Sequence, residues 1–159
     1  MRILGIDPGY DRVGWAVVEC DARKNCVVIA YDCIQTSNKA TTWQRYSQII
    51  DSLKTAITEH KPTAAAIESI FFSNNQKTAI RVSEARGVII ATLLPHIAVV
   101  SEYTPNQIKL AVTGYGNSDK AAVEKMVRLQ LKLNSTTVID DTIDAVATAF
   151  THALLQGAH

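Results

Sequence analysis

Residues 2–34 read RILGIDPGYDRVGWAVVECDARKNCVVIAYDCI and contain three apolar runs separated by short turn-forming stretches. The runs cover residues 2–7, 13–20 and 26–34, and the last two are rich in β-branched and aromatic side chains. Runs of this length, bounded by Pro, Gly, Asp and Asn, are typical of strands joined by tight turns. This stretch therefore predicts three consecutive antiparallel strands.

The chain beyond this stretch alternates between helical spacing and short apolar runs. Apolar side chains three and four residues apart predict helices over 41–60 and 76–94, while the runs 63–70 and 97–103 predict buried strands. The first helix is expected to bury Trp43, Tyr46, Ile50, Leu53 and Ile57.

Three more helices are expected in the last third of the chain. Thr104-Pro105 has the residues of a helix start, Ser118 is a second candidate N-cap, and a third helix begins at Asp140 or Asp141. Antiparallel strands followed by alternating strands and helices predict an α/β fold, in which a mixed sheet carries helices on its faces.

The composition fits one globular domain. The 159 residues are 47% hydrophobic and 19% charged, and no apolar run approaches the roughly 18 residues that span a bilayer. We therefore expect a single domain over residues 1–159 without a membrane segment. The three cysteines, Cys20, Cys26 and Cys33, match no metal-ligand spacing and are interpreted as reduced thiols, which predicts a cytoplasmic protein.

Two acidic residues stand at the end of an apolar run or inside one. Asp7 ends the first run before Pro8-Gly9, and taken alone it is better explained as a turn residue. Glu68 interrupts the run from Ala64 to Phe72, where a carboxylate without a partner is unfavourable. An exposed position on a strand edge would explain Glu68 without a function, but local conflicts of this kind tend to mark functional sites.

Asp141 and Asp144 are three residues apart at the start of the last predicted helix. That spacing places both carboxylates on one helix face, where their repulsion is partly offset by the helix dipole. Helix capping by Asp140 or Asp141 explains one or two of these acids. It does not explain why the pair adjoins the apolar face that carries Ile143 and Val146.

The four acids could converge on one cleft and hold metal ions. Carboxylates without His or Cys favour Mg²⁺ or Mn²⁺, and two such ions about 3.5–4 Å apart can hold the attacking water and the leaving oxygen of a phosphodiester. The net charge of +1 does not by itself indicate a nucleic-acid binder. With four acids neutralised by metal, however, 16 Lys and Arg residues would face 11 remaining acids, which suits a phosphate backbone.

Aromatic and basic residues lie near these acids in the sequence. One ring of Phe71-Phe72 is expected in the core, and the other could stack on an unpaired base. Lys109 and Lys120 flank the stretch 114–117, whose glycines would allow close approach to a phosphate, although ordinary solvated lysines explain them equally simply.

Taken together, these segments resemble the RuvC family of Holliday-junction resolvases, which belongs to the ribonuclease H-like superfamily. The resemblance is carried by LGIDPGYDRVGWAVV (4–18), AIESIFFSNNQKTAIRVSEARGVI (66–89), YTPNQIKLAVTGYGNSDKAAVEKMV (103–127) and DDTIDAVATAFTHA (140–153). It implies a mixed five-stranded sheet with helices on both faces. It also implies a metal-dependent endonuclease of DNA recombination and repair that resolves four-way junctions by paired nicks.

The resemblance also implies a set of site residues. The family's catalytic and metal-binding acids fall by motif on Asp7, Glu68, Asp141 and Asp144. The implied DNA contacts are base stacking by Phe71 and further contacts by Lys109, Lys120 and Arg81.

The resemblance implies ions and partners as well. Two Mg²⁺ ions are expected in each active site, with Mn²⁺ as a substitute, and a junction-migrating helicase complex is an expected partner. A two-fold symmetric junction suits a homodimer. We expect the helix over 76–94 at its interface, because Ala85 and Gly87 would permit close approach.

Other functions remain to be separated from junction resolution. Another ribonuclease H-like nuclease with a different substrate would cut an RNA–DNA hybrid at least as efficiently as a junction. A non-catalytic junction-binding module is disfavoured because all four acids are present. The GIDPG motif also resembles the first phosphate loop of sugar-kinase and actin-like ATPases, but those folds need two such domains.

Overall fold

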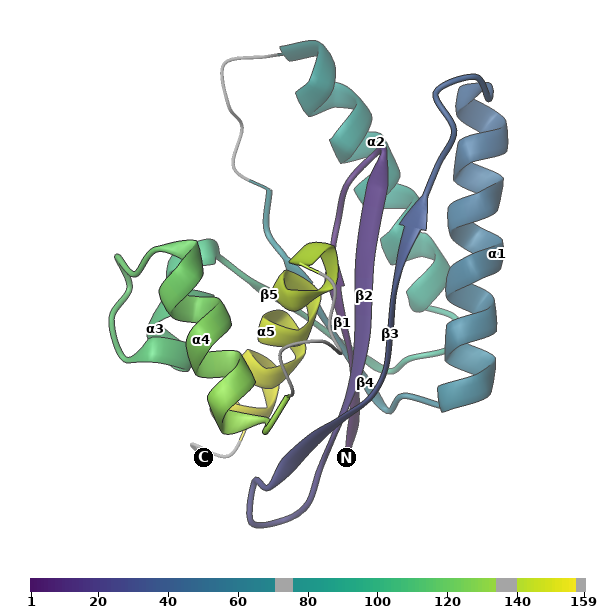
Figure 1. Ribbon diagram of the computed structural model, residues 1–159. Coiled ribbons are helices and arrows are strands. Elements are labelled where there is room, and N and C mark those ends of the chain that lie inside the picture. The colour runs from purple at the N-terminus through teal and green to yellow at the C-terminus, as the bar shows by residue number, and fades with distance from the viewer. Residues whose placement is uncertain (71–75, 134–139, 157–159) are drawn as a thin grey trace.

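The structure is a computed structural model that describes residues 1–70, 76–133 and 140–156, without the side chains of 76–78 and 140–141. A five-stranded sheet lies between two layers of helices (Figure 1). The strands are β1 (Arg2–Asp7), β2 (Arg12–Cys20), β3 (Cys26–Gln35), β4 (Ala64–Glu68) and β5 (Val99–Tyr103). Their order across the sheet is β3-β2-β1-β4-β5.

The sheet is mixed, as the strand pattern predicts. β1, β2 and β3 form an antiparallel meander, whereas β4 runs parallel to β1 and β5 runs parallel to β4. The helices are α1 (Thr42–His60), α2 (Gln76–Leu93), α3 (Pro105–Thr113), α4 (Lys120–Gln130) and α5 (Asp140–Leu155). The order of strands and helices agrees with the order expected from the sequence.

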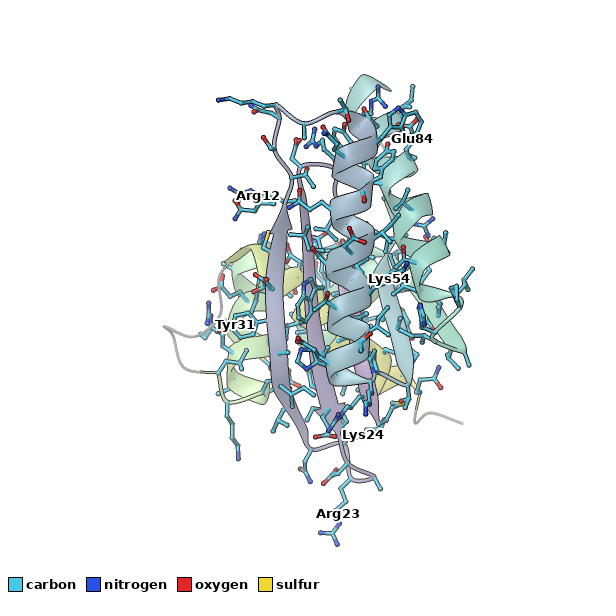
Figure 2. The ribbon with its side chains drawn as sticks, turned by 90° about the vertical axis from the view of Figure 1, so that its right-hand side faces the viewer. Arg12, Arg23, Lys24, Tyr31, Lys54 and Glu84 are labelled. Carbon is cyan, nitrogen blue, oxygen red and sulfur yellow. A yellow bond between two sulfur atoms is a disulfide. The ribbon has the colours of Figure 1, made fainter. Side chains whose placement is uncertain are left out.

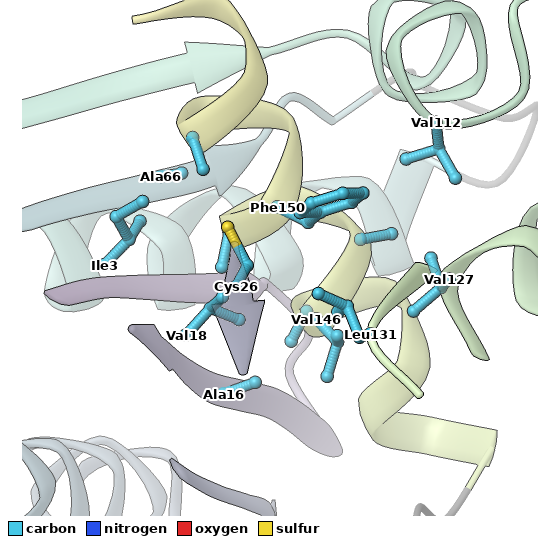
Figure 3. Close-up of a cluster of buried hydrophobic side chains, with 14 of the residues drawn as sticks. Ile3, Ala16, Val18, Cys26, Ala66, Val112, Val127, Leu131, Val146 and Phe150 are labelled. Atoms are coloured by element: carbon cyan, nitrogen blue, oxygen red, sulfur yellow. The ribbon is translucent and has the colours of Figure 1, made fainter. Parts of the chain in front are cut away.

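The two faces of the sheet bury separate hydrophobic clusters. α1 and α2 cover one face, and α5 packs on the other with α3 and α4 outside it (Figure 1). The cluster under α1 and α2 includes Leu4, Ile6, Trp15, Leu53 and Ile89. The cluster under α5, part of which Figure 3 shows, includes Ile3, Ala16, Ala66, Val146 and Phe150.

The starts of α1, α3 and α4 are capped by side chains, with one difference from expectation. Thr41 and Thr104 each form a capping box with the Gln three residues later. The prediction that Ser118 caps α4 is wrong, because Asp119 accepts the hydrogen bond from the Ala122 amide at 2.7 Å. An ionised carboxylate also interacts favourably with the helix dipole.

The predicted buried face of α1 and the predicted interface residues of α2 each need a correction. Trp43 is 78% exposed, and Arg45 takes a buried position on α1 instead. On α2, Ala85 is fully buried within the subunit, so it cannot line an outward interface. Gly87 makes no close packing contact with the described residues, since a Cβ there would meet none of their atoms within 4 Å.

Two of the three cysteines form a disulfide, so the interpretation of all three as reduced thiols is wrong. The β2–β3 register places Cys20 opposite Cys26, with 4.1 Å between their Cα atoms, and their sulfur atoms are bonded. This bridge closes the hairpin that carries Arg23 and Lys24 at its tip (Figure 2). Cys33 lies further along β3 and carries a thiol. Across the described ranges, no helix combines the length and apolar character needed to cross a bilayer.

Candidate active site

The ends of β1 and β4 bring two of the predicted acids together. The strands are parallel neighbours, and Ile6 pairs with Ile67. Asp7 and Glu68 follow these partners directly and therefore end the two strands side by side. The carboxyl edge of parallel strands is the place where ligand sites form in α/β folds.

The close approach of α5 to β1 brings the third acid to the same edge. A Cβ added to Gly5 would lie 2.1 Å from the carbonyl oxygen of Ala145 and 2.8 Å from the Cβ of Ala149. The backbone of α5 thus rests directly on β1, which is possible only over a glycine. Asp144 precedes Ala145 on the helix, so this contact holds its carboxylate near the end of β1.

The charges at this edge are strongly coupled. Burial, followed by repulsion from Asp7 and then from Asp144, raises the pKa of Glu68 from 4.5 to about 7. Lys120 and Lys109 act in the opposite direction. Burial is the largest cause, and the two neighbouring carboxylates add a repulsion that a bound cation would relieve.

The two predicted DNA-binding lysines line the same pocket as Glu68 and Asp144. Lys120 Nζ lies 2.8 Å from Asp144 Oδ2. The pocket has a volume of about 160 Å³ and is lined by Glu68, Pro105, Ile108, Lys109, Lys120, Val123, Asp144 and Ala147. α3 and α4 therefore form a wall that carries a cation on each helix beside the acidic edge.

The donor set fits a hard divalent cation, since it consists of carboxylates. Among the side chains that the structure describes, no three acidic, His or Cys groups already enclose a metal position. Lys120 pairs with Asp144, and the side chain of Asp141 lies outside the described part. The backbone of Asp141 lies on α5, three residues before Asp144.

Of the two other predicted DNA contacts, the structure describes only Arg81. Phe71 lies outside the described residues. Arg81, on α2, donates to Glu84 at 2.9 Å and lies 6.0 Å from the centre of the Tyr10 ring. It is not among the residues that line the pocket.

Sequence reasoning did not identify the pairing of Lys120 with Asp144 or the buried Arg45. The ion pair joins α4 to α5, and no local pattern connects the two residues. The burial of Arg45 was predictable from the sequence, because Arg45 precedes Ile49 and Leu53 at a spacing of four on the buried face of α1.

The comparisons with known proteins agree with this arrangement. The family model described as crossover junction endodeoxyribonuclease RuvC matches residues 3–152. A protein of that name from Caldicellulosiruptor saccharolyticus is 42% identical over 154 residues, which cover 97% of this chain and 93% of the relative. Its counterpart from Petrotoga mobilis is 44% identical over 153 residues, covering 96% of this chain and 93% of the relative.

Two solved structures that resemble this chain are also RuvC proteins. The Thermus thermophilus RuvC structure superposes with a TM-score of 0.89 at 29% identity, covering 99% of this chain and 96% of the other. T. thermophilus RuvC in complex with a Holliday junction substrate gives a TM-score of 0.90 at 30% identity, covering 97% and 93%. The mixed sheet with helices on both faces is thus the fold of these structures. The chain belongs to the crossover junction endodeoxyribonuclease RuvC family.

Proposed function

We propose that this protein is a structure-selective endonuclease that resolves four-way DNA junctions by hydrolysing phosphodiester bonds. The observation that carries the proposal is the convergence of Asp7, Glu68 and Asp144 beside Lys109 and Lys120 at one edge of the sheet. Acids and cations in one pocket suit a metal-assisted reaction on a phosphate. The Thermus relative of the same fold holds a Holliday junction.

The proposed cofactor is a pair of Mg²⁺ ions, with Mn²⁺ as a substitute. The residues that would hold them are Asp7, Glu68, Asp141 and Asp144. Such ions, when bound, lower the pKa of the attacking water and stabilise the leaving oxygen. The repulsion of Glu68 by Asp7 and Asp144, which adds to the effect of burial on the pKa of Glu68, supports this assignment, because a divalent cation would relieve it.

The basic residues of the pocket would position the DNA. Lys120 would exchange its ion pair with Asp144 for one with a DNA phosphate, which leaves Asp144 available to the metal. Lys109 would contact a second phosphate. Phe71 would stack on a base near the junction centre, where bases unstack easily. Arg81 would contact a junction arm from α2.

The proposed assembly is a homodimer, since a four-way junction with two-fold symmetry needs two equivalent active sites. Its interface would use the outward face of α2. Ile80 on α2 and Leu94 directly after it are exposed, and Gly87 lies midway between them at the heptad spacing that suits helix pairing. A chromosomal substrate would place the dimer in the cytoplasm, where a junction-migrating helicase complex would supply it.

The test is incubation of a synthetic mobile junction with Mg²⁺, followed by mapping of the nicks on all four strands. We expect paired nicks on two strands of like polarity. Asp7→Asn should lower the cleavage rate about 10³-fold or more while junction binding persists, because a lost metal ligand removes several kcal/mol of transition-state stabilisation.

A matched control is Asp51→Asn, which changes an exposed acid on α1 far from the pocket. It should leave cleavage unchanged. Equal or faster cutting of an RNA–DNA hybrid would favour another substrate class, and junction binding by the wild type without any nicking would favour a non-catalytic module.

A further inference from the structure

The buried Arg45 is a charged residue that the pocket itself does not explain. Its side chain is only 7% exposed and lies between α1 and the turn that joins β1 to β2. Burial of a guanidinium is costly unless its donors are satisfied. The partners that offset this cost therefore indicate what the residue does.

The guanidinium of Arg45 is directed at the turn between β1 and β2. Its Nη2 donates to the carbonyl oxygen of Tyr10 at 3.3 Å and forms an ion pair with Asp11. Its centre lies 3.7 Å from the centroid of the Tyr10 ring, a cation–π distance. These contacts fix the backbone and the side chains of two consecutive turn residues.

The Nε donor of Arg45 reaches the same turn through Thr36. Arg45 Nε donates to Thr36 Oγ1 at 2.8 Å, and that hydroxyl donates to the Tyr10 carbonyl at 2.8 Å. The Thr36 amide donates to the Asp11 carbonyl at 2.9 Å. The segment after β3 and the helix α1 therefore hold the turn together, with Arg45 between them.

This turn connects directly to Asp7. Pro8 is buried, and a Cβ on Gly9 would lie 2.1 Å from the carbonyl oxygen of Arg12, so the chain reverses tightly within a few residues. Arg12, labelled in Figure 2, begins β2 at the same end of the sheet. A shift of the turn would consequently move the end of β1, where Asp7 contributes its carboxylate.

We propose that Arg45 is a positioning residue that holds the turn Pro8–Asp11 and, through it, the carboxylate of Asp7 in its metal-binding position. The inference rests on the proposed metal-dependent function. Metal sites of this kind require ligand positions accurate to about 0.5 Å, so an anchor on the adjoining turn affects metal affinity before it affects DNA binding.

The test compares three variants. Arg45→Met removes the charge and the donors but keeps much of the apolar length, and Arg45→Lys keeps the charge without the planar fork. Arg2→Met is the matched control, because Arg2 begins the same strand that Asp7 ends and makes similar contacts, with Glu19 at 2.9 Å and the His60 carbonyl at 3.0 Å. Each variant is first checked for folding by circular dichroism.

The primary readout is Mn²⁺ affinity by calorimetry without DNA, followed by junction affinity without metal and by the Mg²⁺ dependence of cleavage. We expect Arg45→Met to weaken Mn²⁺ binding about tenfold or more, as substitution of groups that orient metal ligands does. The Mg²⁺ concentration for half-maximal cleavage should rise in parallel. Junction affinity should stay near wild type, Arg45→Lys should be intermediate, and Arg2→Met should bind Mn²⁺ like wild type.

Wild-type Mn²⁺ affinity in the Arg45 variants, or an equal loss in Arg2→Met, overturns the inference. If Arg45→Met does not fold, Arg45→Lys carries the test with the same criterion. Asp7→Asn separates this inference from the proposed function. If Asp7→Asn loses metal binding and cleavage while the Arg45 variants retain both, only the positioning role fails; if Asp7→Asn retains both, the proposed function fails.

Discussion

The two faces of the sheet differ in the size of their side chains, and only the face under α5 borders the acidic pocket. Under α1 and α2 the sheet presents large residues such as Leu4, Ile6 and Trp15. Under α5 it presents several small ones, including Gly5, Ala16 and Ala66, beside larger residues such as Ile3. Large side chains bury more apolar area, whereas small ones allow a helix backbone to approach the strands closely.

This difference separates stability from the placement of the site. The face under α1 and α2 supplies bulk burial, which tolerates small adjustments in the position of a helix. The face under α5 places Asp144 next to the ends of β1 and β4, where a displacement of one side-chain width would separate the acids. The following predictions test this division, beginning with the largest expected effect on the free energy of unfolding.

Gly5→Ala should affect both stability and chemistry. Its new Cβ would clash with the backbone of α5 at Ala145, so we expect a loss of about 4 kcal/mol in the free energy of unfolding. Because the clash moves α5, the folded fraction should also lose metal affinity. Urea unfolding and Mn²⁺ calorimetry measure the two effects.

Leu4→Ala is the counterpart on the opposite face and gives the comparison its control. It should cost about 3 kcal/mol through the cavity it leaves. Its folded fraction should bind Mn²⁺ like wild type. A comparable loss of metal affinity in both variants would show that the two faces do not differ in the way described.

Glu68→Gln should stabilise the metal-free protein at high pH while abolishing cleavage. With the pKa of Glu68 raised to about 7, the folded protein binds more protons than the unfolded chain between about pH 4.5 and 7. Stability therefore falls as pH rises through that window, by up to about 3 kcal/mol from this group. Chemical unfolding in EDTA at pH 5 and pH 8 tests this, and lower stability of Glu68→Gln at pH 8 would contradict it.

Reduction of the Cys20–Cys26 disulfide should reduce stability by about 2 kcal/mol, the value expected for a loop this short. The bridge closes the β2–β3 hairpin and is not among the residues that line the acidic pocket. Cleavage by the reduced protein should consequently remain at the wild-type rate. Cys20→Ala/Cys26→Ala measured with and without reductant provides the control, since it should not respond to reductant.

Tyr103→Phe should have the smallest effect, about 1 kcal/mol. It removes the hydrogen bond between the Tyr103 hydroxyl and His152 Nδ1, which measures 2.9 Å in the core under α5. Burial lowers the pKa of His152, so the folded state favours the neutral imidazole. The free energy of unfolding therefore falls as the pH drops below 6.5, and the measurement is made above that pH. Urea unfolding at pH 8 measures the effect, and a loss above that of Leu4→Ala would contradict this ranking.

The sequence predicts the elements of this fold well because their signals are local. Period-two and period-3.6 patterns lie in neighbouring residues, so the strands and helices follow in the expected order. Local spacing predicts the burial of individual residues less reliably. Trp43 fits the apolar spacing of α1 but is exposed, and Arg45 is buried with hydrogen-bond partners from outside the helix.

The disulfide and the Lys120–Asp144 pair show a second limit of sequence reasoning, which concerns contacts between separate segments. Cys20 and Cys26 face each other only because of the strand register, which includes a shift between Val17 and Val18. No spacing rule connects Lys120 to Asp144. Such contacts depend on how elements pack, and packing is a property of the whole chain.

Local patterns were sufficient to identify Glu68 as unusual, since it interrupts an apolar run, whereas Asp7 taken alone fits a turn before Pro8-Gly9. Their function depends on facts that no local pattern contains. The parallel pairing of β1 with β4 places the two acids side by side, and Gly5 lets α5 bring Asp144 to them. The physical reason is that a site is formed by distances in space, whereas sequence patterns report the environment of one segment at a time.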